Sequence, residues 1–186
     1  MIHDFKHHIN MMKSLSQKGD QTEIEKYLDS IDKNSSISDN KIITGNKIID
    51  VVIYQKSEQC RDKGIKFVFY PNNISFDFVE EADICCILSN LLDNAIEAAE
   101  KSADKTVKME FFRNSDNNMY FIEIENSCDT KPEKSSGHFV TSKKDKQKHG
   151  IGIYSVEKMV RKYKGESELC YIAETKTFKT SVMIHR

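Results

Sequence analysis

The sequence lacks an excess of charge of either sign. Lys and Arg total 28 against 29 Asp and Glu, which leaves a formal net charge of -1 in 186 residues. A protein that binds nucleic acid or an anionic membrane through its overall field needs a clear positive balance. Direct binding of nucleic acid is therefore not expected, and any basic site must be local.

Paired cysteines and long apolar runs are also missing. The five cysteines are odd in number and form no CxxC pair, so neither a disulfide framework nor a zinc site is indicated, which fits a reducing compartment. No apolar run reaches the roughly 18–20 residues that a membrane-spanning helix needs, and no signal peptide opens the chain. Because a functional-looking motif begins almost at residue 1, we expect the chain to be a fragment of a longer protein.

Residues 1–40 are predicted to form a helical hairpin. Apolar residues recur at 3-4-3 spacing on both sides of "QKGDQ", where Gly19 ends one helix and Asp20 caps the next. Two short amphipathic helices bury little against each other, so we expect them to pair with a second copy as a four-helix bundle. A polar hinge, "DKNSSISDNK", follows.

Residues 41–186 are predicted to form an α+β domain, with helices on one face of a mostly antiparallel sheet. Glycine, proline and asparagine clusters separate the segments of helical and strand periodicity. Helices are predicted over residues 46–63, 79–102 and 150–164, and strands over 65–70, 106–113, 119–126, 165–173 and 177–185. Residues 127–149 are predicted to be a charged loop.

The second predicted helix carries two asparagines in "NLLDNAIEAAE". Asn90, Asn94 and Glu97 form a stripe beside the apolar face that is expected to meet the sheet. Asparagine is a mediocre helix former, whereas amide and carboxylate oxygens are the ligands that Mg²⁺ prefers, together with phosphates. The stripe is either a magnesium and phosphate site or a solvated polar face.

Two glycines, Gly150 and Gly152, lie where the third predicted helix begins, in "KHGIGIYSV". Free N–H groups and the positive end of the helix dipole bind anions there, and glycine lets a phosphate approach the backbone. A flexible loop before a helix has the same pattern. The preceding lysine-rich stretch would add positive charge over a triphosphate, and its length is typical of a lid.

Two further polar features are candidates for function. Asn126 ends a strand of alternating apolar residues and either faces a pocket or closes the strand with an Asx turn. Near the N-terminus, His3 is followed by Asp4, and His7 lies one helical turn further on. The histidines are exposed side chains, metal ligands without a third partner, or, for His3, a nucleophile whose other ring nitrogen is held by Asp4.

The order of these motifs resembles that of a known family. A His-Asp helix, then "NLLDNA", then a strand ending in Asn126, then "FVTSK…HGIGI" is similar to the ATP-binding GHKL fold joined to the histidine-bearing helices of sensor histidine kinases. "TGNKIIDVVIYQKSEQCRDKGI" and "HDFKHHI" further resemble the accessory-gene-regulator-type branch, which contains peptide-pheromone receptors. The resemblance covers nearly the whole chain and implies a GHKL α/β sandwich over residues 41–186.

The resemblance implies ATP and Mg²⁺ as ligands and gives each motif a role. Asn90 and Asn94 would hold Mg²⁺ and the phosphates, with Glu97 ordering the site. Asn126 stands where the family has an aspartate that accepts a hydrogen bond from adenine, although the glycines that follow it are missing here. His3 would be the phosphorylated histidine, with Asp4 as its partner. The other implied nucleotide contacts are Phe139, Lys143, His149, Gly150, Ile151 and Gly152.

The residue at position 90 distinguishes ATP hydrolysis from phosphoryl transfer to a histidine. GHKL ATPases have at this position a glutamate that activates water as a general base, and an asparagine cannot take up a proton at neutral pH. The γ-phosphoryl group would then go to His3 rather than to water. The alternatives are a GHKL ATPase, which would release phosphate steadily, and a nucleotide-binding module or serine kinase that would not need His3.

The resemblance also implies partners. The family forms homodimers through the histidine-bearing helices and passes the phosphoryl group to an aspartate of a response regulator, here one with a LytTR-type DNA-binding output. The full-length protein would be a membrane-embedded receptor of a bacterium, with these residues on the cytoplasmic face.

Overall fold

The structure is a computed structural model that describes residues 44–114, 118–132, 134–135, 138–139 and 151–186. Residues 41–186 belong to one compact unit. The predicted hairpin of residues 1–40, with His3 and Asp4, lies outside the described residues, and so does the basic loop over residues 140–150. The division into two domains therefore stays a prediction.

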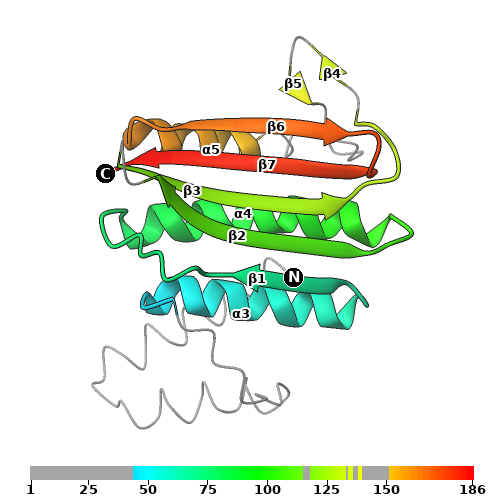
Figure 1. The fold of residues 1–186 in the computed structure, drawn as a ribbon, viewed down its shortest axis with the longest axis horizontal. Coiled ribbons are helices and arrows are strands. Elements are labelled where there is room, and N and C mark those ends of the chain that lie inside the picture. The colour runs from blue at the N-terminus through cyan, green and yellow to red at the C-terminus, as the bar shows by residue number, and fades with distance from the viewer. Residues whose placement is uncertain (1–43, 115–117, 133, 136–137, 140–150) are drawn as a thin grey trace, which may run out of the picture. The chain divides into compact units, whose positions relative to one another are not determined.

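A five-stranded sheet forms the centre of the fold (Figure 1). Its order is β1-β2-β3-β7-β6; β1 pairs with β2 in parallel, and the other neighbouring strands are antiparallel. The strands are β1 (Lys66–Tyr70), β2 (Thr106–Asn114), β3 (Met119–Ser127), β6 (Glu166–Ile172) and β7 (Thr177–His185). The predicted strands and the mostly antiparallel sheet are thus confirmed.

Within the predicted loop, two short strands pair outside the main sheet. They are β4 (Lys134–Ser135) and β5 (His138–Phe139). The predicted loop over residues 127–149 is therefore wrong at these four residues, because two-residue pairings carry no readable alternation of apolar and polar residues.

Within the described residues three helices accompany the sheet: α3 (Lys47–Asp62), α4 (Glu81–Glu100) and α5 (Ile151–Lys162). Figure 1 shows α4 and α5 on the same face of the sheet, and α3 packs against α4 and β1. The three predicted helices are confirmed, each shorter by one or two residues at its ends. No helix in the described part of the chain has the length and apolarity needed to cross a bilayer.

The ends of α3 show why the helix lies where it does. The side-chain oxygen of Asn46 accepts hydrogen bonds from the backbone N–H groups of Ile48 at 2.9 Å and Ile49 at 3.2 Å, which caps the first turn. At the other end Gly64 has φ +66°, a conformation that glycine adopts without strain, and it turns the chain into β1.

The core lies between the sheet and the helices. Alternate residues of β3 are buried toward α4, from Tyr120 through Ile122 and Ile124. On α4, Ala98 is half-buried, whereas Ala99 is fully buried. The helix is buried on a second side because α3 packs along it, a contact that the apolar pattern of α4 alone does not specify.

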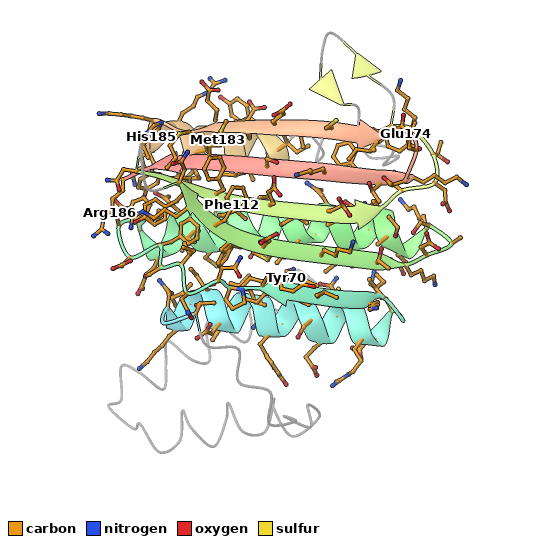
Figure 2. All side chains as sticks on the ribbon, viewed as in Figure 1. Tyr70, Phe112, Glu174, Met183, His185 and Arg186 are labelled. Carbon is orange, nitrogen blue, oxygen red and sulfur yellow. The ribbon has the colours of Figure 1, made fainter. Side chains whose placement is uncertain are left out.

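The opposite face of the sheet carries apolar side chains of its own. Phe112 and Met183 project from the face turned away from α4 and α5 (Figure 2). Phe112 stacks on Phe121 of the neighbouring strand with ring centroids 4.5 Å apart and an interplanar angle of 5°. Such cross-strand pairs stabilise a sheet by about 0.2–1 kcal/mol each.

Candidate functional site

Asn90 lies at the middle of α4 and faces the start of α5. Its amide nitrogen donates a hydrogen bond to the backbone oxygen of Cys86 at 2.8 Å and lies 3.3 Å from the sulfur of Cys86. This fixes the orientation of the carboxamide and directs Oδ1 away from its own helix. A Cβ atom placed on Gly152 would lie 3.0 Å from this Oδ1, so the two positions are in direct contact.

The approach of Gly152 to Asn90 places a helix N-terminus beside an amide oxygen. The backbone N–H groups of the first turn of a helix have no partner within that helix, and they carry the positive end of its dipole. α5 begins at Ile151, so Gly152 belongs to this first turn. The arrangement provides donors for an anion and an oxygen ligand for a cation at one place, which suits a metal-bound phosphate.

The other end of α5 is fastened to the start of α4. Asp83 Oδ2 accepts hydrogen bonds from Lys162 Nζ and from Tyr163 Oη, both at 2.7 Å. The hydrogen bond from Lys162, followed by that from Tyr163, holds the pKa of the Asp83 carboxyl below its ordinary value. α5 therefore runs antiparallel to α4, with its C-terminal end at Asp83 and its N-terminal end at Asn90.

Beyond Asn90, the predicted polar stripe continues along α4. Asn94 is solvent-exposed, and Glu97 is half-buried with its carboxylate 3.2 Å from the Lys101 ammonium group. Asp93, next to Asn94, instead pairs with Lys56 of α3 at 2.5 Å. The exposure of Asn94 leaves its carboxamide accessible to a ligand next to Asn90.

Asn126 is placed at the end of β3 on the side that faces the helices. It is only 4% exposed, and its amide nitrogen donates a hydrogen bond to the backbone oxygen of Ser127 at 2.9 Å. The side-chain oxygen is thereby oriented as an acceptor. The side chain is thus buried rather than solvent-exposed, and its role in a ligand site stays a prediction.

Two serines that the sequence analysis missed hold this end of the site together. Ser102, just after α4, and Ser127, at the end of β3, are buried with their hydroxyl oxygens 2.5 Å apart. Ser127 also accepts a hydrogen bond from the backbone N–H of Thr106 at 2.9 Å. The end of α4 thus lies beside Asn126, about 15 Å along the helix from Asn90 at 1.5 Å per residue.

Other predicted site residues lie outside what the structure describes. These are His3, Asp4, Lys143, His149 and Gly150, together with the side chains of Phe139 and Ile151, whose backbones belong to β5 and α5. The residues that the structure does bring together are Gly152 and Asn90, with Asn94 and Glu97 farther along α4 and Asn126 near its end.

A sequence profile of the GHKL domain matches residues 79–185. The chain belongs to the GHKL domain family. This GHKL domain is similar to the sensor histidine kinase DpiB of Escherichia coli (strain K12), at 23% identity over 171 residues, which cover 85% of the chain and 31% of DpiB. The chain therefore spans about a third of the length of that relative.

Solved structures share the fold of this GHKL domain. The nucleotide-free catalytic domain of the histidine kinase ThkA has a TM-score of 0.55 at 19% identity, over 75% of this chain and 92% of that one. Full-length ShkA in complex with AMPPNP has a TM-score of 0.55 at 14% identity, over 76% of this chain and 29% of ShkA. The predicted GHKL α/β sandwich is confirmed.

Proposed function

We propose that this GHKL domain is the catalytic part of a sensor histidine kinase, which transfers the γ-phosphoryl group of ATP to His3. The observation that carries the proposal is the contact between Gly152 and Asn90, in which an amide, and not a carboxylate, lies beside the N-terminus of α5. The similarity to DpiB, named as a sensor histidine kinase, points to the same reaction class.

The described residues fit a magnesium nucleotide. A Cβ atom at Gly152 would crowd Asn90, so glycine lets the first turn of α5 lie against this carboxamide. A phosphate would bind beside it, at the helix N-terminus. Asn90 and Asn94 would hold Mg²⁺, which when bound neutralises charge on the phosphates. At the far end, the side-chain oxygen of Asn126 would accept a hydrogen bond from the adenine amino group.

The chemistry of Asn90 favours transfer to a histidine over hydrolysis. A carboxamide cannot remove a proton from water, so Asn90 does not generate a hydroxide nucleophile. In the proposed step a ring nitrogen of His3 bonds to the γ-phosphorus, the bond from that phosphorus to the β,γ-bridging oxygen breaks, and ADP leaves with the electron pair. Asp4 would hold the other ring nitrogen and stabilise the charge that develops there.

Further roles rest on the resemblance alone. Lys143, His149 and the backbone of Gly150 and Ile151 would contact the phosphates, Phe139 would belong to a lid, and Glu97 would order the polar stripe. We place the chain in the accessory-gene-regulator-type branch, as a homodimer that pairs through residues 1–40. Its proposed partner is a response regulator with a LytTR-type output, and a membrane-embedded receptor segment would precede it in the full-length protein of a bacterium.

Incubation of the chain with γ-labelled ATP and Mg²⁺ tests the reaction. We expect label that stays on the protein, is lost in acid, survives alkali and disappears in His3→Gln. Continuous phosphate release without labelled protein would instead support a GHKL ATPase. Acid-stable label that persists in His3→Gln would support a serine kinase. Repeating the measurement on a longer chain that includes more of the histidine-bearing region controls for an incomplete helical bundle.

A further inference from the structure

We propose that four residues joining α4 to α5 are positioning residues for the phosphate end of the nucleotide site. We call this group the α4–α5 clamp; it consists of Glu80, Asp83, Lys162 and Tyr163. The proposal rests on the proposed function and adds that the clamp keeps the N-terminus of α5 against Asn90. Phosphate affinity would then depend on side chains at the opposite end of α5.

The clamp is centred on a nearly buried carboxylate. Asp83 is 8% exposed, and one of its oxygens takes hydrogen bonds from both Lys162 and Tyr163 at 2.7 Å. A buried charge that loses its partner is strongly destabilising, so Asp83 ties the end of α5 firmly to the first turn of α4. Asp83 lies on the buried face of α4, one turn before Ile87.

The tyrosine hydroxyl is used twice. It donates to Asp83 and accepts a hydrogen bond from the backbone N–H of Glu80 at 2.9 Å. Glu80 precedes α4 as its N-cap residue but makes no side-chain capping bond, so the Tyr163 side chain, just after α5, holds the backbone there instead. A phenylalanine at position 163 would keep the ring and lose both hydrogen bonds.

The lysine is shared between two carboxylates. Lys162 Nζ lies 2.9 Å from Glu80 Oε2 and 2.7 Å from Asp83 Oδ2. The hydrogen bond to Asp83, followed by that to Glu80, raises the pKa of the lysine, and the pKa of Asp83 is lowered. The clamp therefore stays charged at neutral pH, and its hydrogen bonds are charge-assisted and strong.

Rigidity of α5 links the clamp to the proposed phosphate site. The helix runs from Ile151 to Lys162, about 18 Å at 1.5 Å per residue. Val156 and Val160 are buried along it, and the tight contact of Gly152 with Asn90 lies at its far end. Loss of the clamp would let α5 tilt or slide, and a misplacement of about 1 Å in such a site lowers function by up to about a hundredfold.

The test compares ligands with and without phosphates on the full chain. Dissociation constants of Mg²⁺-AMPPNP and of adenosine are measured by calorimetry below the melting temperature of every variant. We expect Tyr163→Phe and Lys162→Met to weaken AMPPNP binding by about tenfold or more, as misplacement of a binding group does. Adenosine binding should stay unchanged, because Asn126 lies at the other end of α4. Lys162→Arg, which keeps the charge and the donors, should retain most of the AMPPNP affinity.

Lys108→Met is the matched control, because the Lys108–Glu125 pair at 3.5 Å lies on the open face of the sheet. It should leave both affinities unchanged. Equal weakening of AMPPNP and adenosine in the clamp variants, or no weakening at all, would show that the clamp serves stability alone and overturn the proposal. If the unaltered chain binds adenosine but not AMPPNP, or binds neither, the proposed function fails and the clamp proposal fails with it.

Discussion

Asn90 and Gly152 lie so close together that one additional methyl group on the glycine would come within 3.0 Å of the asparagine side-chain oxygen. The two residues come from different helices and from separate motifs of the sequence. Their contact converts two ambiguous patterns, a polar stripe and a pair of glycines, into one place with oxygen ligands and backbone donors.

Gly152→Ala should weaken binding of Mg²⁺-AMPPNP by about tenfold, because the new methyl group displaces the Asn90 carboxamide. Stability should fall little, since alanine favours a helix over glycine by about 1 kcal/mol. Calorimetry measures the affinity and thermal unfolding the stability. Lys158→Ala, at an exposed position of the same helix, serves as the control. Unaltered affinity in Gly152→Ala would mean that phosphates do not bind at this contact.

Asn94→Ala should abolish the Mg²⁺-dependent part of ATP binding while leaving the fold intact, because the residue is exposed and its proposed role is to hold the metal. The measurement is a pair of titrations with AMPPNP, with Mg²⁺ and with EDTA. Asp93→Ala is a suitable neighbour control, since it removes only the ion pair with Lys56. If both variants bind the magnesium complex like the unaltered chain, the proposed metal site is wrong.

Asn126→Asp should lower the free energy of unfolding by about 1–3 kcal/mol, the usual cost of breaking a buried hydrogen bond. The new carboxylate cannot donate to the Ser127 backbone oxygen, which lies 2.9 Å from the present amide nitrogen. Urea unfolding at pH 7 measures the change. The same exchange at exposed Asn73 should cost much less. Equal losses at the two positions would contradict the orientation described for Asn126.

Gly165→Ala should destabilise the fold by about 3 kcal/mol or more, as overpacking does when the backbone must move. A Cβ atom there would lie 2.1 Å from the backbone oxygen of Met183 and 2.9 Å from a methyl group of Val160. Urea unfolding measures this change in the free energy of unfolding. A variant as stable as the unaltered chain would show that the backbone between α5 and β6 does not lie this close to Met183 and Val160.

Cys60 should make stability depend on pH in the alkaline range. Burial raises the pKa of its thiol to about 11, although the charges of Lys56 and Lys63 act in the opposite direction. Because the unfolded thiol loses its proton near pH 8.5, its contribution is fully present below that pH and is lost as pH rises toward 11. The difference in unfolding free energy between the unaltered chain and Cys60→Val should narrow between pH 8 and pH 10.5. A constant difference would contradict the raised pKa.

Much of the fold could be predicted because the segments that form it carry local signals. The alternation of apolar residues in β3 and the glycine at position 64 mark where elements run and end, and the structure follows them. The burial of Ala99 in the core could not be predicted in the same way. It depends on α3 lying along α4, a contact between elements whose periodicity says nothing about their neighbours.

The sequence indicated individual residues of the candidate site but not which of them lie close together. Asn90 and Gly152 stand out in the sequence because asparagine and glycine are unfavourable inside a helix. Asp83 and Ser127 did not stand out, because a short polar residue near the end of a helix or strand is common there. Their roles depend on hydrogen-bond partners that are distant in the sequence, and only the fold brings these partners together.

β7 occupies the interior of the sheet although it is the last strand in the sequence. Until residue 185 has left the ribosome, β3 keeps an unpaired edge and β6 has no neighbour. Phe178, which lies beside Asn126 across this junction, arrives equally late. The complete sheet can therefore form only after all of its strands have been synthesised. A chain that stops anywhere before residue 177 would expose the unpaired edge of β3, which favours aggregation, and would not form a smaller functional domain.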